Sequence, residues 1–198
     1  MPGRDDLDEP RPDRRDRTVE FLAMYEPVAP AIFAWARLHV HPPLRRRVDP
    51  EDVLQEVSFR AFDRFDRFDP DVASFRSWLF GIAHNVLRES LRNLRGRGES
   101  VFGPARGSQI AGFDGFAAEA TNVSTRIARE EGFVQFLERL EDLPDEDRRL
   151  LIYRGLEGRP HQEVADRLGI GSDAAEKRWQ RLRKRLQESG LPAGLLAS

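Results

Sequence analysis

Apolar positions recur along most of the chain at three- and four-residue spacing, and segments with alternating polar and apolar positions are absent. This period is typical of α-helices that bury one side, so the fold class is predicted to be all-α. Seven helices are expected, at residues 18–38, 50–67, 74–94, 124–141, 145–155, 160–168 and 172–188.

Residues at the expected helix ends support these limits. Pro50 and Pro144 lie at or near the first position of a helix, where the missing N–H of proline does no harm. Ser74 can cap the helix at 74–94, and Gly169 suits the left-handed position that follows a helix.

The helices fall into two blocks, an N-terminal domain at 18–95 and a C-terminal domain at 126–189. Between them, residues 96–125 contain six glycines and no sustained apolar period, which predicts a flexible linker. Residues 1–17 are charged and contain three prolines, so we expect a disordered tail, and residues 190–198 form a short second tail. The predicted architecture is therefore two small helical domains on a flexible tether.

The C-terminal block has the layout of a helix-turn-helix. Val164 and Ala165 face inward on the first helix, Gly169 makes the turn, and residues 172–188 form the second helix. A narrow apolar strip on the second helix is opposed by five cations: Lys177, Arg178, Arg181, Lys184 and Arg185. This pattern is typical of a recognition helix in a DNA major groove. The alternative is an ordinary amphipathic helix whose cations complement the helix dipole.

The helix expected at 74–94 also has an apolar side and a basic side. The apolar side is formed by Phe75, Leu79, Ile82, Ala83 and Val86, and the opposite band by His84, Asn85, Arg88, Arg92 and Arg95. Arginine binds phosphate through two parallel hydrogen bonds and stacks on bases, so the basic band suits a polyanion. A solvated charged surface is the alternative.

The preceding helix is acidic. Residues 49–71 contain eight acids and three arginines, and Asp52, Gln55 and Glu56 project together near the start of the helix. Acids in a first turn also complement the helix dipole, which is the simpler interpretation. Their position directly before a basic helix nevertheless suggests two partners, a nucleic acid and a basic protein surface.

The overall composition limits the classes of function. The 32 Lys and Arg residues and 34 Asp and Glu residues give a net charge of −2, so any nucleic-acid surface must be local. The chain has no cysteine, its histidines lack metal-ligand spacing, and it has no phosphate-loop or hydrolase motif. We therefore expect no metal, no cofactor and no enzymatic activity. No apolar run approaches the roughly 20 residues that span a bilayer, so we expect a cytoplasmic protein without membrane insertion.

Three segments resemble those of bacterial RNA polymerase sigma factors. Residues 49–59, DPEDVLQEVSF, are similar to the helix that docks on the polymerase clamp, and residues 75–85, FRSWLFGIAHN, to the promoter-melting helix that follows it. Residues 143–186 resemble the C-terminal sigma domain that reads the upstream promoter element. The brevity of the two-domain chain points to the extracytoplasmic-function (ECF) group.

The resemblance implies a non-enzymatic subunit that binds core RNA polymerase, directs it to promoter DNA and opens the minus-ten element. Asp52, Gln55 and Glu56 would contact the clamp region of the polymerase. The residues implied at the minus-ten element are Arg76, Trp78, His84, Asn85, Arg88 and Arg92, with the loop at 66–74 holding a flipped base. Those implied at the upstream element are Ser172, Asp173, Lys177, Arg178, Arg181, Lys184 and Arg185, of which Arg178 and Arg181 would reach base edges. An anti-sigma factor is a plausible further partner.

Several positions depart from the family pattern. Glu89 stands where the family usually has Asp, Glu176 stands where a basic residue is common, and residues 171–173 read GSD instead of Ser-x-Gly. The expected linker is also longer than is typical.

Two other classes of protein remain as alternatives. A stand-alone helix-turn-helix regulator with an N-terminal sensing domain explains the C-terminal block but not the acidic and basic pair of helices before it. A nucleic-acid enzyme would need a catalytic constellation, which the sequence lacks. Binding to core polymerase discriminates, because a sigma factor requires it and a plain repressor binds its operator alone.

Overall fold

The computed structural model describes residues 14–40, 42–97 and 114–197, and the described residues form helices and turns with no strand. The predicted all-α fold class is confirmed. The elements in chain order are α1 (Arg14–Tyr25), α2 (Ala29–His39), the 3₁₀ turn η1 (Pro42–Leu44), α3 (Pro50–Asp63), the 3₁₀ turn η2 (Phe65–Arg67), α4 (Phe75–Arg97), α5 (Asp114–Arg129), α6 (Glu131–Glu141), α7 (Asp145–Leu150), the π-helical turn η4 (Leu151–Leu156), α8 (His161–Leu168) and α9 (Ser172–Glu188).

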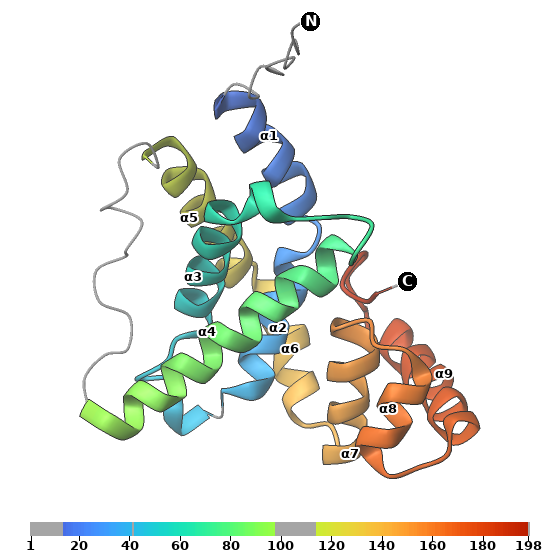
Figure 1. Cartoon of the computed structure of the whole chain (residues 1–198). Coiled ribbons are helices and arrows are strands. Elements are labelled where there is room, and N and C mark those ends of the chain that lie inside the picture. The colour runs from blue at the N-terminus through green and yellow to red at the C-terminus, as the bar shows by residue number, and fades with distance from the viewer. Residues whose placement is uncertain (1–13, 41, 98–113, 198) are drawn as a thin grey trace, which may run out of the picture.

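Helix α2 forms the centre of the molecule and contacts α3, α4, α5, α6 and η4. Its sequence, APAIFAWARLH, is apolar nearly all round, as expected for a helix with neighbours on every side. The long helix α4 crosses in front of it (Figure 1). The apolar side predicted for α4 is confirmed, since Phe75, Leu79, Ile82, Ala83 and Val86 are all buried.

The N-terminal segment differs from the prediction. Instead of one helix at 18–38, the chain breaks after Tyr25, because Pro27 and Pro30 each lack a backbone donor and Pro30 fits the first turn of α2. Residues 1–13 of the expected tail lie outside the described residues, but 14–17 are helical. Arg17 ties this start to the core, donating to the Asp66 carboxylate at 2.7 Å and to the Phe62 carbonyl at 2.6 Å.

The expected linker also needs correction. Residues 98–113 of it lie outside the description, whereas residues 114–125 belong to α5. Helix α5 packs on α3 through an apolar strip of Phe116, Ala120, Val123 and Ile127, all buried. The Phe116 ring stacks on Phe62, with centroids 3.9 Å apart. The helix predicted at 124–141 is likewise divided, between α5 and α6.

The C-terminal helices follow the prediction closely, and α9 has the predicted limits. Gly169 ends α8 with φ 67°, the left-handed conformation that its position required. The segment at 145–155 departs in detail, because α7 continues into the π-helical turn η4.

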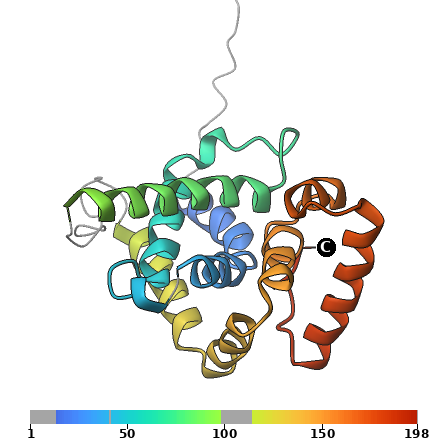
Figure 2. The ribbon, with the colours of Figure 1, turned by 90° about the horizontal axis from the view of Figure 1, so that it is seen from below.

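Residues 190–197 are docked, contrary to the expectation of a simple tail. The Leu195 side chain is buried, and the Ala197 N–H donates to the Gly155 carbonyl at 2.7 Å. Buried residues from both predicted domains also form one hydrophobic core. Helices α6–α9 accordingly lie directly beside α2 and the start of α4 (Figure 2).

Candidate nucleic-acid interface

The outward side of α4 carries an exposed strip that consists of Ser77, Gly81, Asn85, Arg88 and Arg92. The helix starts after Ser74, whose hydroxyl accepts the Ser77 N–H at 3.2 Å, as predicted for a cap. Within the described part of the chain, Arg88 and Arg92 have no carboxylate partner. Both guanidinium groups are therefore available to an external anion.

Glu89 does not neutralise this strip. Its carboxylate accepts from Arg60 of α3 at 2.7 Å, and Arg60 also donates to Glu56 at 2.6 Å. The acid at position 89 is thus committed to the contact between α3 and α4. The departure from the usual Asp leaves the cationic character of the exposed strip intact.

The other three residues expected at the minus-ten element have partners within the molecule. Arg76 donates to the carbonyls of Leu156 and Gly194, at 2.6 and 3.2 Å. His84 Nε2 lies 3.1 Å from Glu157 Oε1, and half-buried Trp78 packs against the ring of Phe68. The structure thus divides the predicted set into an exposed half and a half that contacts neighbouring elements.

The residues at the acidic start of α3 differ in exposure and in their partners. Asp49 caps the helix by accepting the Glu51 N–H at 2.8 Å. Asp52 is exposed, and partial desolvation together with the charges of Asp49 and Glu51 raises its pKa. Glu56 is largely covered by its ion pair with Arg60, and Gln55 is half-buried. A cationic partner would therefore stabilise the charged form of Asp52 more than it would affect the other two residues of the set.

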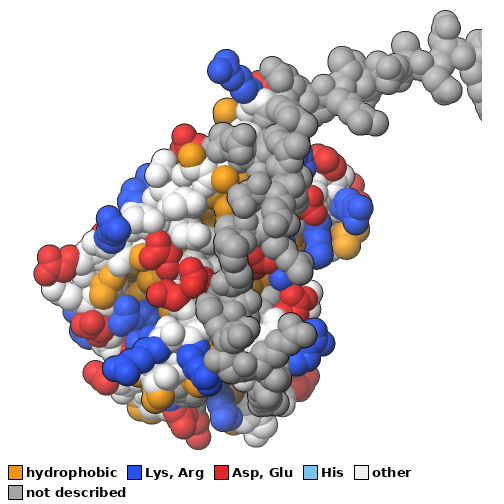
Figure 3. Space-filling model, turned by 90° about the vertical axis from the view of Figure 1, so that its left-hand side faces the viewer, with side chains coloured by type: hydrophobic (Ala, Val, Ile, Leu, Met, Phe, Trp, Pro, Cys, Tyr) orange, Lys and Arg blue, Asp and Glu red, His pale blue; other side chains and the backbone are white. Residues whose placement is uncertain are grey.

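Helix α5 approaches the same acidic start. Thr125 donates to Glu51 at 2.9 Å, so residues expected to be a linker lie against the expected polymerase surface. Figure 3 views the side of α5 and the C-terminal end of α4, where acidic and basic side chains are interspersed.

Helix α9 presents its cations in two ways. Arg178 donates to Asp147 at 2.8 Å and also pairs with Glu146, while Arg185 pairs with the second oxygen of Asp147. Burial opposes ionisation of Asp147, but the hydrogen bonds from Arg185 and Arg178 hold its pKa below the usual range. Two of the five predicted cations are therefore fixed by acids of α7.

The remaining residues of the predicted α9 set are more open to solvent. Lys177, Arg181 and Lys184 are exposed, as is Asp173, while Ser172 is half-buried. Gly171 occupies the N-cap position without a side-chain hydrogen bond, which is the local effect of the GSD sequence. The exposed cations form a side of α9 that a DNA backbone could reach.

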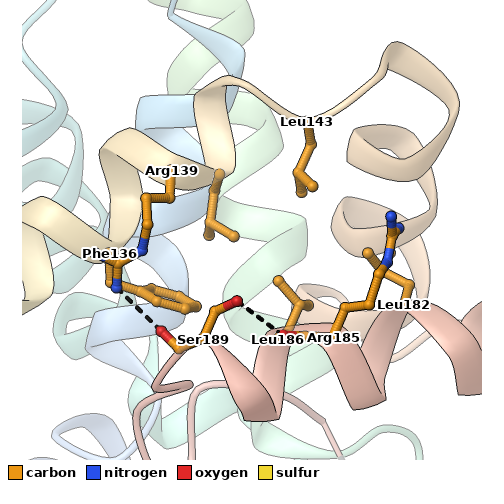
Figure 4. Close-up of a pocket in the computed structure, with 8 residues that line it drawn as sticks. Phe136, Arg139, Leu143, Leu182, Arg185, Leu186 and Ser189 are labelled. Atoms are coloured by element: carbon orange, nitrogen blue, oxygen red, sulfur yellow. Dashed lines mark hydrogen bonds between the residues drawn. The ribbon is translucent and has the colours of Figure 1, made fainter.

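A small groove opens between α6 and the end of α9 (Figure 4). Arg139 bridges one end by donating to the Ser189 carbonyl at 3.1 Å. The groove has a volume of about 210 Å³ and is lined mainly by Phe136 and four leucines. It is smaller than the roughly 300–1,000 Å³ of small-molecule sites. Apolar side chains would fit there better than a cofactor.

Neither a membrane-spanning helix nor a metal site is found among the described residues. No helix among them is long and apolar enough to cross a membrane. Within the same ranges, no group of three or more acids or histidines is arranged to hold a metal ion.

Comparison with known families accounts for both basic helices. The Sigma-70 region 2 model matches residues 24–97, and the Sigma-70 region 4 model matches residues 133–186. Together the two matches cover more than half of the chain, in the order that sigma factors have. The chain belongs to the ECF-type RNA polymerase sigma factors.

Several sigma factors are similar to this ECF chain. RNA polymerase sigma factor CnrH of Cupriavidus metallidurans is 29% identical over 70% of this chain and 71% of its own length. ECF sigma factor SigD of Mycobacterium tuberculosis H37Rv is 28% identical over 85% of this chain and 76% of its own. EcfG of Rhodopseudomonas palustris is 26% identical, covering 69% and 68% respectively.

Membership of the ECF group makes this protein a transcription initiation factor, and that family is non-enzymatic. Region 2 spans α2 to α4 and region 4 spans α6 to α9. A stand-alone regulator would leave the region 2 match unexplained.

Sequence reasoning missed two acids of this sigma factor that organise the basic helices. Asp147 binds both Arg178 and Arg185, and buried Glu157 contacts Trp35, His84 and Arg159. The acidic run at 145–147 was a visible signal for the first network, because α9 is so basic. Nothing local marks Glu157, whose partners are up to 122 residues away in the sequence.

Proposed function

We propose that this sigma factor docks on the clamp region of core RNA polymerase through α3, melts the minus-ten element with α4, and reads the upstream promoter element with α9. The observation that carries the proposal is the presence of two basic helices in one chain, each within its own sigma region.

For the minus-ten element, the exposed strip of α4 supports contact with a melted strand. Asn85, Arg88 and Arg92 lie on one side without competing carboxylates among the described residues. Phosphate contacts would hold the strand, and the loop at 66–74 would accept a flipped base. Val72 in that loop is 81% exposed and offers an apolar surface to an unstacked base.

For the upstream element, the helix-turn-helix geometry supports contact with duplex DNA. Exposed Lys177, Arg181 and Lys184 suit phosphate or base contacts in a major groove, and Arg178 and Arg185 are already oriented by Asp147. Of the two expected base contacts, Arg181 is the more accessible. Ser172 and Asp173 complete the proposed surface at the start of the helix.

For the polymerase, the proposed contact is the set of Asp52, Gln55 and Glu56. Partial desolvation and the charges of two neighbouring acids raise the pKa of Asp52, so a cationic surface would stabilise its charged form. The Glu56 side chain is mostly covered and is paired with Arg60. Its contribution to polymerase binding would therefore be partly direct and partly through the position of Arg60.

The test is capture of core polymerase by the full chain, followed by promoter-dependent transcription. Charge reversal by Asp52→Lys together with Glu56→Lys should abolish association with core polymerase while the helical circular dichroism stays unchanged. Glu119→Lys, on the exposed side of α5, is the matched control. Unchanged capture by the doubly reversed variant would overturn the docking assignment.

The family suggests an anti-sigma factor as a further partner, and we extend the proposal to such a regulator. Because its targets are the polymerase and promoter DNA, the protein would act in the cytoplasm.

A further inference from the structure

The N-terminal end of α4 meets a segment that lies beyond the region 4 match. Residues 190–197 follow α9 and run beside the first turn of α4, where the C-terminal end is marked in Figure 1. Arg76 joins the two: its guanidinium donates to Gly194 at 3.2 Å and to Leu195 at 3.4 Å. The same group also donates to the Leu156 carbonyl at 2.6 Å.

Among the described residues, the hydrogen-bond partners of Arg76 are carbonyl oxygens and not carboxylates. Burial lowers its pKa, as expected for a cation that neighbouring dipoles solvate only in part. A phosphate would add the attraction of a full negative charge and could accept two parallel hydrogen bonds from the guanidinium. The present partners of Arg76 are therefore ones that a nucleic-acid backbone could replace.

Segment 190–197 is seated firmly on η4. Leu195 is buried, and Ala197 donates to the Gly155 carbonyl at 2.7 Å. At Gly155 an added Cβ would come within 3.0 Å of Leu196 and 2.7 Å of Trp179, so only glycine admits both neighbours. The segment thus connects α9, through Trp179 and η4, to Arg76 on α4.

A second contact closes the same seam. Glu157, directly after η4, accepts from the indole of Trp35 in α2 at 2.8 Å and faces His84 of α4 at 3.1 Å. Its other oxygen pairs with Arg159. Two residues that the sequence resemblance implies at the minus-ten element, Arg76 and His84, are therefore both contacted by the C-terminal region.

We propose that segment 190–197 is an intramolecular latch: it holds region 4 against α4 and occupies Arg76, so that the closed molecule withholds part of its single-strand surface. The latch rests on the proposed function in one respect, the assignment of Arg76 to DNA. Release of the segment would remove two of the three carbonyl partners of Arg76 and weaken the seam that the contacts of α2 with η4 and α6 also hold.

The test uses the full chain with Leu195→Asp, which places a charge at the buried anchor. Ala193→Asp is the matched control, because it adds the same charge to an exposed position of the same segment. Leu195→Ala is a milder second variant, for use if circular dichroism shows that the aspartate unfolds region 4.

Opening is measured by energy transfer between two dyes. The chain contains no cysteine, so Glu20→Cys and Gln187→Cys provide unique exposed sites on α1 and α9. Transfer efficiency should fall in the Leu195 variants and stay at the parent level in Ala193→Asp. Equal efficiency in all variants would overturn the latch.

Masking is measured by binding to a random-sequence pool of single-stranded DNA at several salt concentrations. If the open form is about a tenth of the parent population, opening raises the affinity up to tenfold. The salt slope, which is the slope of the logarithm of the binding constant against the logarithm of the salt concentration, should steepen by about 0.7 because Arg76 gains one phosphate contact. Adding Arg76→Ala to the Leu195 variant should remove that increment.

Two results would contradict masking. One is a Leu195 variant that opens without a change in salt slope. The other is absence of binding by all variants to both DNA and core polymerase, which would overturn the proposed function itself. In that second case the energy transfer still decides whether segment 190–197 closes the molecule.

Discussion

The two basic helices of this sigma factor hold their cations differently. On α4, Arg88 and Arg92 project from the surface with no carboxylate partner in the described part of the chain. On α9, Arg178 and Arg185 share the carboxylate of Asp147, which is almost fully buried. The described residues of the first helix include two exposed arginines without a carboxylate partner, and the second helix has two arginines oriented by Asp147.

This difference suits the two DNA substrates proposed for them. A melted strand is flexible, so arginine side chains without a fixed partner can adapt to it and gain little from being oriented beforehand. A duplex presents fixed groove edges, and side chains held in place beforehand lose less entropy on binding. The comparison also shows that a count of cations on a helix is a poor measure of those available to DNA.

The largest expected effect comes from α4. Arg88→Ala combined with Arg92→Ala should reduce open-complex formation at least about 100-fold, since two lost hydrogen bonds between charged groups, at about 1.5–3 kcal/mol each, together remove about 3–6 kcal/mol. Permanganate footprinting of the bubble measures this, with polymerase capture as the parallel readout. Arg129→Ala, exposed on α5, is the control. If the double variant forms a normal bubble, the exposed strip of α4 is a solvated surface that does not contact the melted strand.

On α9 the corresponding change should alter affinity for duplex DNA without impairing melting. We expect Arg181→Ala to cost about 1–3 kcal/mol if it contacts a base and to relax preference at one position. Lys177→Ala should weaken all sequences alike and lower the salt slope by about one. Arg183→Ala, exposed on the same helix outside the proposed surface, is the control in a randomised-duplex selection. An effect of Arg183→Ala as large as that of Arg181→Ala would reject the assigned side of the helix.

Glu157 of region 4, which carries α9, contacts Trp35 and His84 of region 2, which carries α4. Its contribution to stability should depend on pH. Burial opposes its ionisation, but hydrogen bonds from His84, Arg159 and Trp35 hold its pKa below the usual value. Glu157→Gln should lower the free energy of unfolding at pH 7 by about 1.5–3 kcal/mol, the value of hydrogen bonds to a charged group.

The sign of the pH effect follows from the lowered pKa. The stabilisation by Glu157 is complete above the unfolded value of about 4.3 and is lost as the pH falls through the lower folded value. The difference in unfolding free energy between parent and variant, measured by denaturant unfolding, should therefore be constant above about pH 4.3 and shrink progressively as the pH falls below it. A stability difference that does not shrink as the pH is lowered below about 4 would contradict the charge-based account.

The smallest expected effect concerns the fixed arginines. Asp147→Asn should release Arg185 and leave Arg178 paired with Glu146 alone, raising affinity for random duplex DNA about threefold through the added positive charge. Discrimination between preferred and random sequences should fall by a similar factor. Asp166→Asn, an exposed change on α8, controls for charge alone. If discrimination survives in Asp147→Asn, the ion pairs have no orienting role.

The local parts of this fold were predictable from sequence. The limits of α9, the turn at Gly169 and the cap at Asp49 follow from spacing and from residues with one conformational preference. Helix α5 was missed because the glycines around it dominated the composition. Its apolar positions at 116, 120, 123 and 127 were nevertheless a readable helical signal.

The long-range parts were not predictable in the same way. Half-exposed Arg76 looks like any basic residue of an amphipathic helix until residues 194 and 195 are placed beside it. The burial of Glu157 depends on Trp35 and His84, which no spacing rule connects. Accordingly, the sequence predicted which helices are basic, whereas the structure was needed to find which cations are occupied.

Helix α5 also contributes to how far apart the two DNA-binding helices could move. Its 16 residues span about 24 Å as a helix but about 55 Å when extended. While α5 is helical and docked on α3 through Phe116, the difference between these two lengths does not contribute to the tether. If α5 detached and unwound, the tether would lengthen by about 30 Å, close to one turn of duplex DNA.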